Sequence, residues 1–363
     1  MREPYQAGSD WPLIDGLTLE GRPNRREDHA QTSQQHASTQ QHSNPAPPTP
    51  PTRAIVTTLI ALIACHNRRD LTLRCLRSLF HSVPAGVTLS AVLVDDGSTD
   101  GTADAVRDLR LPVEIVHGDG SWFWSRSVAE AESVAERDDP DWLLWLNDDV
   151  VLRPDALLQW RMAANRLPDS ILVGGLQAPG LGRPFYSGFD WPDRADLTAT
   201  NTRPPNGALR RVEGFHGNFV AVPRSARRRI GPVDGTWPHN YADLDYALRA
   251  GEAGVAIWVL PRVVGECDPT RPAWMERRNP RWIRVRSVVS RKNWPVRAHW
   301  RLHRRHGTGA WPIRAWTPHW YALTGRRRTS TSPETEDGGD PVGAGNGGSG
   351  AAGPAGPGAA HQR

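Results

Sequence analysis

Hydrophobic and polar residues alternate along the first half of the chain in blocks that predict strands followed by helices. Residues 55–65 form an uncharged, partly β-branched run, which predicts a buried strand. In residues 66–82 leucines recur at helical spacing with arginines on the other side, which predicts an amphipathic helix. The alternation continues with strands predicted at 89–95, 113–118 and 141–152 and helices at 98–109, 125–139 and 153–167.

The second half of the chain has a less regular pattern. It predicts strands at 171–177, 218–223 and 255–261 and a loop that enters a short helix at 239–254, while residues 178–211 read as loop. Strands that alternate with helices favour an α/β fold, with a mainly parallel central sheet and helices on both faces.

Composition divides the chain into four predicted segments. Residues 1–53 are rich in Gln, Ser, Thr, Pro and His, and residues 329–363 in Gly and Pro, so both are expected to be disordered tails. Residues 54–270 are expected to form the α/β domain, and residues 271–328 a basic, Trp-rich helical extension.

The extension at 271–328 is strongly basic. It contains fifteen Arg and one Lys against the single acid Glu276, together with seven Trp. This mixture can indicate nucleic acid, an anionic membrane surface or a polyanionic substrate, or simply a solvated basic face with Trp packed beneath it. The membrane and the solvated face are favoured equally, and nucleic acid is the weakest of these hypotheses.

The cysteines indicate a reducing compartment. Cys65, Cys75 and Cys267 have neither disulfide-framework nor zinc spacing. The N-terminal residues lack a hydrophobic signal core, and the longest early apolar run is too short to span a bilayer. We therefore expect a cytoplasmic protein. If the basic segment binds lipid, the protein would lie peripherally at the inner face of the membrane.

A polar interruption lies inside one apolar run. In "WLLWLNDDVVL", residues 142–152, Asn147, Asp148 and Asp149 separate two apolar stretches. Asn and Asp favour turns, but two adjacent carboxylates repel each other unless water or a cation neutralises them. This stretch alone leaves a turn and a metal site equally open.

Further acidic residues follow other predicted strands. Asp95 and Asp96 end the second strand, and Asp119 follows the third. Because ligands of parallel α/β sheets bind beyond the carboxyl ends of the strands, these groups and the polar interruption are expected to line one rim. No Gly-x-Gly-x-x-Gly follows the first strand, and Walker-type and Gly-x-Ser-x-Gly motifs are absent from the sequence, which disfavours dinucleotide, P-loop and esterase chemistry.

With these motifs in view, the chain resembles the nucleotide-sugar glycosyltransferases of the large inverting family 2, which have the Rossmann-like GT-A fold. The resemblance covers about residues 56–295 and depends on the order of "ACHNRRDLTLRCLRSL", "VLVDDGSTDGT", "LWLNDDVVL" and "YADLDYALRAGEAG". The segments "GDGSWFWSRSVAEA" and "FHGNFVAVPR" are similar to the rhamnosyltransferase-like branch.

The resemblance implies roles for individual residues. Asp243 matches the family's catalytic base. The sequence alone also allows Asp243 to be a helix N-cap. Asp149 matches the ligand of Mg²⁺ or Mn²⁺, a cation that prefers carboxylate oxygen and substrate phosphate. Nucleotide contacts are expected from Asp95, Asp96, Asn147 and Asp148. The donor or acceptor pocket is expected to include Asp119, Trp122, Trp124, His216, Asp245 and Arg249.

The chain also departs from the family pattern. Asn147 stands where the metal motif has its first Asp, and Ala242 precedes Asp243 where an acid or Gly is usual. Many relatives carry a late His that binds the metal. Here the corresponding stretch offers Glu266, Cys267 or Asp268, and the sequence does not choose among them. His239, close to the base motif, is better explained as a hydrogen-bonded loop residue than as a ligand.

The resemblance implies an inverting glycosyltransferase that moves a sugar from a nucleoside-diphosphate donor to a hydroxyl of a glycan or lipid-linked acceptor, by metal-assisted single displacement. One alternative is a sugar-phosphate nucleotidyltransferase, but "CHNRRD" lacks the glycines of its phosphate loop. The other is a basic nucleic-acid-binding protein, which would leave both acidic motifs without a role.

Overall fold

The computed structural model describes residues 56–180, 184–238, 241–268, 273–276, 278–290, 293 and 295–325. The predictions of disordered tails at 1–53 and 329–363, and the interpretation of His239, lie outside the described residues.

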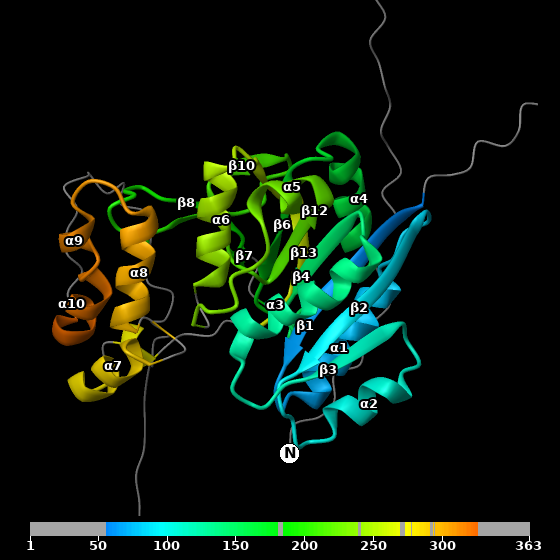
Figure 1. The fold of residues 1–363 in the computed structure, drawn as a ribbon, viewed down its shortest axis with the longest axis horizontal. Helices are drawn as coiled ribbons and strands as arrows, with labels where there is room; N and C mark the ends of the chain where they lie inside the picture. Colours follow the sequence, from blue (N-terminus) through cyan, green and yellow to red (C-terminus); the bar gives the residue numbers. More distant parts are fainter. Residues whose placement is uncertain are drawn as a thin grey trace, which may run out of the picture. The chain divides into compact units, whose positions relative to one another are not determined.

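A mainly parallel sheet forms the centre of the described structure (Figure 1), with strand order β10-β13-β6-β12-β4-β1-β2-β3. Strands β1, β2, β3, β4, β6 and β13 share one direction, whereas β12 lies antiparallel between β4 and β6. The predicted mainly parallel α/β sheet is therefore confirmed. The strand bounds are β1 Thr57–Cys65, β2 Val87–Asp95, β3 Val113–His117, β4 Trp142–Leu146, β6 Ile171–Gln177, β10 Arg210–Val212, β12 Phe219–Pro223 and β13 Ile257–Glu266.

Helices cover both faces of the sheet, because its central strands are apolar on both sides. In β1, Leu59, Ala61 and Ile63 pack with the helices of one face, and Ile60 and Leu62 with those of the other. The first face carries α1 (Arg69–His81), α2 (Thr102–Asp108) and α4 (Ala156–Arg166), and the second carries α3 (Phe123–Ala135), α5 (Arg224–Ile230) and α6 (Ala242–Glu252).

The apolar run at 141–152 forms two strands, where the sequence predicted one. Strand β4 ends at Leu146, the chain turns, and β5 (Val151–Leu152) pairs with the end of β13, with Val151 opposite Glu266. The apolar pattern resumes after the turn because Val150 and Leu152 enter the core. The interruption is thus a turn between two buried strands, and it brings its polar residues to the rim of the sheet.

Residues 184–215 contain short strands that the sequence did not predict. Strand β7 (Pro184–Tyr186) pairs with β6, and a separate sheet joins β8 (Gly188–Asp190), β9 (Asn201–Arg203) and β11 (Gly214–Phe215). Strands of two or three residues are too short to give a readable alternation.

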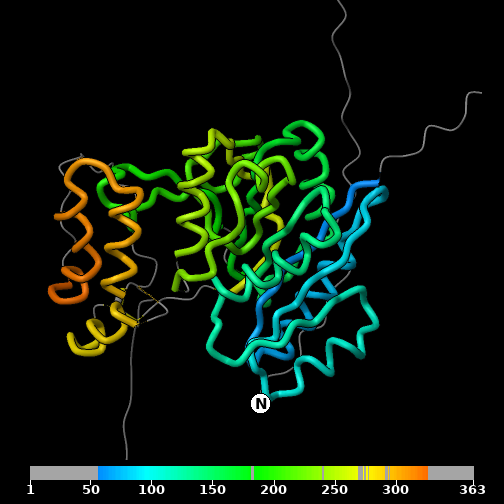
Figure 2. Tube along the Cα trace, in the orientation of Figure 1, coloured from blue at the N-terminus to red at the C-terminus, as the bar shows by residue number. Residues whose placement is uncertain are grey.

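The C-terminal segment is helical, as predicted. It contains the 3-10 helix η2 (Ala273–Met275) and helices α7 (Arg281–Val288), α8 (Val296–His306), α9 (Trp311–Arg314) and α10 (Thr317–Thr324), which are yellow to orange in Figure 2. Leu302 of α8 is part of the core that α6 helps to build. Within the described ranges, none of the helices combines the length and hydrophobicity needed to cross a bilayer.

Candidate active site

The carboxyl ends of the parallel strands bring the acidic motifs to one rim. Cys65 of β1 lies opposite Asp95 of β2, and Asp95 lies opposite His117 of β3. Asp119 follows β3 directly, and Asn147 follows β4, which pairs with β1 on its other side. The loops that carry the acidic motifs therefore begin at one edge of the sheet, because parallel strands end together.

Asp96 organises the loop that leads into α3. Its Oδ1 accepts a hydrogen bond from the Gly120 N–H at 2.8 Å, and its Oδ2 accepts from the N–H groups of Trp122 and Phe123, both at 3.0 Å. Gly118 allows this approach, since a Cβ there would lie 2.6 Å from Asp96 Oδ1. Three of the carboxylate's acceptor positions are used by the backbone, which gives Asp96 a role in shaping the loop.

Asp95 and Asp119 hold the turns at the ends of β2 and β3. Asp95 Oδ1 accepts the Ser98 N–H at 3.0 Å. Asp119 accepts from the N–H and hydroxyl of Ser121, and these hydrogen bonds hold the pKa of Asp119 below its ordinary value. Asp119 is solvent-accessible, whereas Asp95 is buried.

The amide of Asn147 uses both its oxygen and its nitrogen in hydrogen bonds. Its Oδ1 accepts the indole N–H of Trp124 at 3.0 Å, and its Nδ2 donates to Oδ1 of Asn218 at 2.5 Å. An Asn can accept on one side and donate on the other, so it can connect these two groups, whereas an ionised Asp can only accept. This pairing is a physical reason for Asn at the first position of the motif.

Asp148 and Asp149 share one cation. Nη1 of Arg68 lies 3.0 Å from Asp148 Oδ1 and 3.2 Å from Asp149 Oδ2. Burial raises the pKa of Asp148 to about 6, although the charge of Arg68 opposes that shift. Oδ2 of Asp148 is buried without a hydrogen-bond partner among the described residues. The positive charge of Arg68 offsets the repulsion between the two adjacent carboxylates. This role of Arg68 was not predicted from the sequence, although the residue lies in "CHNRRD".

Asp243 lies in the first turn of α6, which begins at Ala242, so it is not the residue before the helix as an N-cap would be. Its Oδ1 accepts the Leu244 N–H at 2.9 Å and its Oδ2 the Gly217 N–H at 3.2 Å. Burial raises the pKa of Asp243 to about 6 despite these hydrogen bonds. As a whole residue, Asp243 is nevertheless partly exposed.

The loop between β11 and β12 joins the acidic motif at residues 147–149 to Asp243. Gly217 donates to Asp243, and its neighbour Asn218 accepts from Asn147. The Trp124 ring packs closely against this loop, since a Cβ on Gly217 would lie 2.5 Å from the ring. Asn147, Trp124 and Asp243, which are far apart in sequence, are thus connected through two residues. The role of Asn218 was not predicted from the sequence, although the residue lies in "FHGNFVAVPR", where "HGN" is the signal that could have indicated it.

The remaining predicted pocket residues differ in position. The His216 ring lies 5.6 Å from that of Tyr186, and burial lowers the pKa of His216 to about 4, so it is neutral at neutral pH. The guanidinium of Arg126 stacks 4.5 Å from the centre of the Trp122 ring. Both His216 and Trp122 are partly exposed, as lining residues require.

Asp245 and Arg249 do not line the open site. Asp245 is fully buried, and its carboxylate hydrogen-bonds Arg249 Nε at 2.8 Å and His306 Nε2 at 3.0 Å and forms an ion pair with Arg305 Nη1 at 3.1 Å. Burial opposes ionisation, but His306 and the two arginines hold the pKa of Asp245 below its ordinary value. Arg249 also donates to the carbonyl of Ile230 at 2.8 Å, so both residues anchor the helix that carries Asp243.

The stretch at the end of β13 offers little to a metal. Glu266 Oε1 accepts from Gln177 Nε2 at 2.9 Å. Burial, and then the charges of Asp149 and Asp268, raise the pKa of Cys267 to about 12. A thiol is also not the oxygen ligand that Mg²⁺ or Mn²⁺ prefers. No group of three or more potential ligands is found within the described residues. A single carboxylate such as that of Asp149 is compatible with Mg²⁺ or Mn²⁺, because these cations take one or two carboxylates and complete their shell with water and substrate phosphate.

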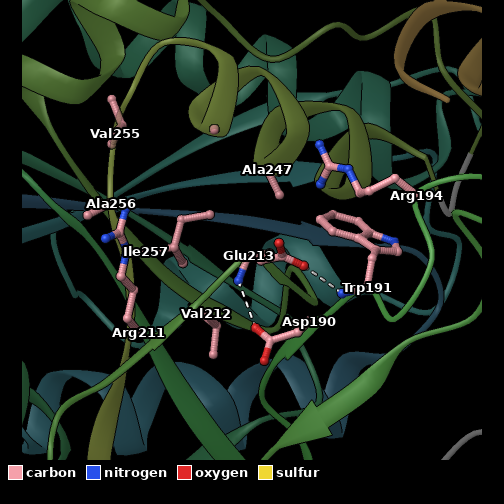
Figure 3. A pocket seen from close by; sticks show the side chains of 11 residues that line it. Asp190, Trp191, Arg194, Arg211, Val212, Glu213, Ala247, Val255, Ala256 and Ile257 are labelled. Carbon is pink, nitrogen blue, oxygen red and sulfur yellow. Dashed lines mark hydrogen bonds between the residues drawn. The ribbon is translucent and has the colours of Figure 1, made fainter. Parts of the chain in front are cut away.

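A pocket of about 670 Å³ lies elsewhere (Figure 3). It is lined by Trp191, Arg194, Glu213 and the segment 255–257, which precedes and begins β13. It is therefore at the amino ends of the parallel strands, whereas the acidic motifs are at their carboxyl ends. Its carboxylates are already paired, since Glu213 accepts the Trp191 N–H at 2.8 Å. None of the predicted catalytic or nucleotide-binding residues lines it.

Comparisons with known proteins give a consistent family. Residues 60–230 match the model of the family described as glycosyl transferase family 2. An N-acetylglucosaminyl-diphospho-decaprenol L-rhamnosyltransferase of Mycobacterium tuberculosis is 30% identical over 196 residues, which cover 46% of this chain and 62% of the relative. The galactofuranosyltransferase GlfT2 of Mycolicibacterium smegmatis is 30% identical over 209 residues, which cover 48% of this chain and 31% of the relative.

Among solved structures, that of GalNAc-T7 with UDP, GalNAc and Mn²⁺ superposes with a TM-score of 0.49 at 13% identity, over 65% of this chain and 48% of that one. The matches to the two curated relatives named above cover less than two thirds of the length of each relative.

Proposed function

We propose that the chain, whose residues 60–230 match the model of glycosyl transferase family 2, is an inverting glycosyltransferase of that family that moves a sugar from a nucleoside diphosphate to a hydroxyl group. Within the family it is of rhamnosyltransferase type. The proposed acceptor is a glycan or a lipid-linked sugar in surface-polysaccharide assembly. The proposed location is the cytoplasmic face of a membrane, which the chain would bind peripherally.

One observation carries this proposal. The loop at 216–218 hydrogen-bonds Asn147 of the acidic motif on one side and Asp243 on the other. A donor held at the acidic motif and an acceptor next to Asp243 would therefore be held in one frame, as a single displacement needs. A turn and an unrelated helix terminus would have no reason to be joined in this way.

Asp243 is proposed to act as the general base. Its raised pKa, about 6, makes it a better proton acceptor than an ordinary Asp while leaving it ionised at neutral pH. As the acceptor oxygen forms its bond to the anomeric carbon, the hydroxyl proton passes to Asp243, and the bond to the nucleoside diphosphate breaks. One displacement inverts the configuration at that carbon.

The leaving diphosphate needs positive charge as its bond breaks. Asp149 would hold Mg²⁺ or Mn²⁺, and the cation would supply charge that stabilises the leaving group. Arg68, half exposed beside Asp149, is a second cation at the same rim. Asp95 and Asp96, with Asn147 and Asp148, form the edge proposed to face the nucleotide.

Neither alternative function is favoured. A nucleotidyltransferase would need a glycine-rich phosphate loop after β1, where the chain has His66 and Asn67. A nucleic-acid-binding protein would leave the connection between Asn147 and Asp243 without a purpose.

The test is calorimetric binding of UDP, dTDP and GDP to the wild type, Asp149→Ala and the control Asp104→Ala, with and without Mn²⁺. Asp104 is an exposed carboxylate on α2. We expect one nucleotide to bind the wild type and the control in a metal-dependent way, and Asp149→Ala to lose that dependence. If folded wild-type protein bound none of the three nucleotides, the proposed function would be wrong.

A further inference from the structure

Exposed apolar side chains are concentrated on the C-terminal helices. Of the eleven large hydrophobic residues that are exposed in the described structure, seven lie between residues 275 and 323. Single exposed apolar residues need no explanation, but a concentration of them on one short segment indicates a contact surface. The seven exposed hydrophobic residues of this segment are Met275, Trp282, Val289, Ile313, Trp316, Trp320 and Leu323.

Four of these residues form one stripe along α9 and α10. Trp316, Trp320 and Leu323 follow the spacing i, i+4, i+7, so they share a face of the helix, and Ile313 precedes Trp316 by three residues. The opposite face of α10 already packs inward through His319 and Ala322. A helix that only had to cover a core would expose polar residues here. In α10 the outward stripe is apolar, which requires a second explanation.

Helix α7 repeats this arrangement with a charge in the middle. Trp282, Arg286 and Val289 are exposed at the spacing i, i+4, i+7, with Trp282 65% exposed, while Arg284 and Val288 are buried. Thus α7 and α10 each present an aromatic residue and an aliphatic one to solvent, at opposite ends of a two-turn stripe.

The two helices belong to one packed unit. Val288 of α7 and Ala322 of α10 form a small apolar cluster with Tyr321. The Tyr321 hydroxyl also donates to the carbonyl of Met275, at 3.3 Å, which ties η2 to α10. The yellow and orange helices of Figure 1 show this group beside α8. Because the helices hold one another, their exposed side chains are presented together rather than on independent segments.

The same unit carries unbalanced positive charge. The described residues from 273 to 325 include nine arginines and one acid, Glu276. Arg281, Arg286, Arg297 and Arg304 are exposed and have no acidic partner among the described residues. Arg binds phosphate oxygens through its planar fork, and Trp with aliphatic neighbours prefers the boundary between headgroups and acyl chains. Both preferences point to an anionic bilayer.

We propose that α7, α9 and α10 form a surface that inserts Trp282, Trp316, Trp320 and their aliphatic neighbours into an anionic bilayer, while Arg281 and Arg286 contact lipid phosphates. The proposal deepens the proposed function, on which it rests for its purpose, because it would bring the active site to a lipid-linked acceptor. Binding to vesicles needs neither donor nor acceptor, so its outcome is independent of whether the chain transfers a sugar.

The test is flotation of the full chain with vesicles of phosphatidylcholine alone or mixed with phosphatidylglycerol. The test variant replaces Trp316, Trp320 and Leu323 by Ser. The control replaces Leu158 and Met162 by Ser, because these are exposed apolar residues of α4, far from the basic segment in sequence. We expect wild type and control to float with the anionic vesicles, and the test variant to lose at least about tenfold in affinity. A second variant, with Arg281 and Arg286 replaced by Gln, should lose about tenfold or more on anionic vesicles.

Circular dichroism and urea unfolding establish that each variant is folded. If the Ser variant were unfolded, brominated phosphatidylglycerol should still quench the Trp fluorescence of the wild type. Equal flotation of wild type and folded Ser variant would overturn the proposal, as would wild-type protein that ignores anionic vesicles. A wild-type dimer that the Ser variant converts to a monomer, with no change in flotation, would assign the surface to a second copy of the chain instead.

Discussion

At the scale of single residues, the decisive property of the proposed base is its raised pKa. Burial puts the pKa of Asp243 at about 6, so the form that accepts a proton is lost as pH falls through that value. Turnover should therefore fall about tenfold for each pH unit below 6, because only the ionised carboxylate can act. The measurement is kcat/KM for sugar transfer between pH 4.5 and 8.

A second carboxyl complicates this pH profile. The pKa of Asp148 is also raised to about 6, so two protonations can contribute to the loss of activity. Asp148→Asn should leave a limb with the slope of one proton if Asp243 is the base. A profile that becomes flat in Asp148→Asn would instead assign the limb to Asp148.

Asp243→Asn tests the same residue directly. Asn can still accept one of the two backbone hydrogen bonds from Gly217 and Leu244, so the loop should remain largely in place. Transfer should fall by about 10²–10⁴-fold, while nucleotide binding stays near the wild-type value. Asp104→Asn, at an exposed position, serves as the control. Wild-type turnover by Asp243→Asn would show that the proton goes elsewhere.

At the scale of structural elements, the loop at 216–218 should be intolerant of added volume. A Cβ on Gly217 would lie 2.5 Å from the Trp124 ring, and that ring is fixed by its hydrogen bond to Asn147. Gly217→Ala should therefore reduce the free energy of unfolding by about 1–3 kcal/mol and weaken both nucleotide binding and turnover. Urea unfolding measures the free energy of unfolding, calorimetry measures nucleotide binding, and kcat/KM for sugar transfer measures turnover.

Gly251→Ala is the matched control for this substitution. Gly251 lies near the end of α6, and a Cβ there meets no atom within 4 Å. Alanine should be neutral or stabilise the helix by up to about 1 kcal/mol. If Gly217→Ala behaved like Gly251→Ala, the loop would not be the rigid connection that the proposed function needs.

Helix α8 should stabilise the helix that carries the proposed base. Nε2 of His306 hydrogen-bonds Asp245, and its Nδ1 hydrogen-bonds Glu252 at 2.6 Å, so one side chain contacts both ends of α6. His306→Phe removes both contacts and leaves a buried carboxylate with fewer partners. The free energy of unfolding should fall by about 1–3 kcal/mol, as measured by urea. Arg304→Gln, an exposed neighbour without a described acidic partner, should change it by less than about 0.5 kcal/mol.

At the scale of the whole molecule, the fold was predictable where strands are long. The runs that became β1, β2 and β6 are apolar and partly β-branched, so their pattern is unambiguous. The short strands between residues 184 and 215 were not predictable, because two or three residues cannot show a period. The prediction of one strand at 141–152 was wrong in part, since local pattern does not reveal that β5 pairs with the distant β13.

The residues of the candidate site also divide into those that the sequence could predict and those that it could not. The acidic rim was predicted, since the rule for parallel sheets needs only the order of strands and the residues that follow them. The partners of the rim were not, because Arg68 and Asn218 meet it across more than 70 residues of sequence. Asp245 and Arg249 were expected near the pocket. Their helical spacing predicts that they pair, but not that α8 buries them.

Stability should depend on pH through a buried carboxyl that the proposed chemistry does not use. Glu132 of α3 is buried and accepts the Val233 N–H at 2.7 Å. Burial raises its pKa from 4.5 to about 7, with Glu136 adding to the shift and Arg227 and Arg249 opposing it. The folded state thus holds this proton more tightly than the unfolded state, so the contribution of Glu132 to stability is lost as pH rises from 4.5 to about 7.

The comparison of Glu132→Gln with wild type isolates this contribution. Buried histidines such as His299 and His216 have lowered pKa values, so their contributions to stability rise with pH up to about 6.5 and oppose that of Glu132 in the wild-type profile. They are common to both proteins and cancel in the difference. Because Gln stays neutral and can still accept the Val233 N–H, the variant should gain on the order of 3 kcal/mol relative to wild type between pH 4 and pH 8. Glu130→Gln, at an exposed position of the same helix, should show no such trend in urea unfolding. A difference that stays constant with pH would mean that Glu132 ionises as easily in the folded chain as in the unfolded one.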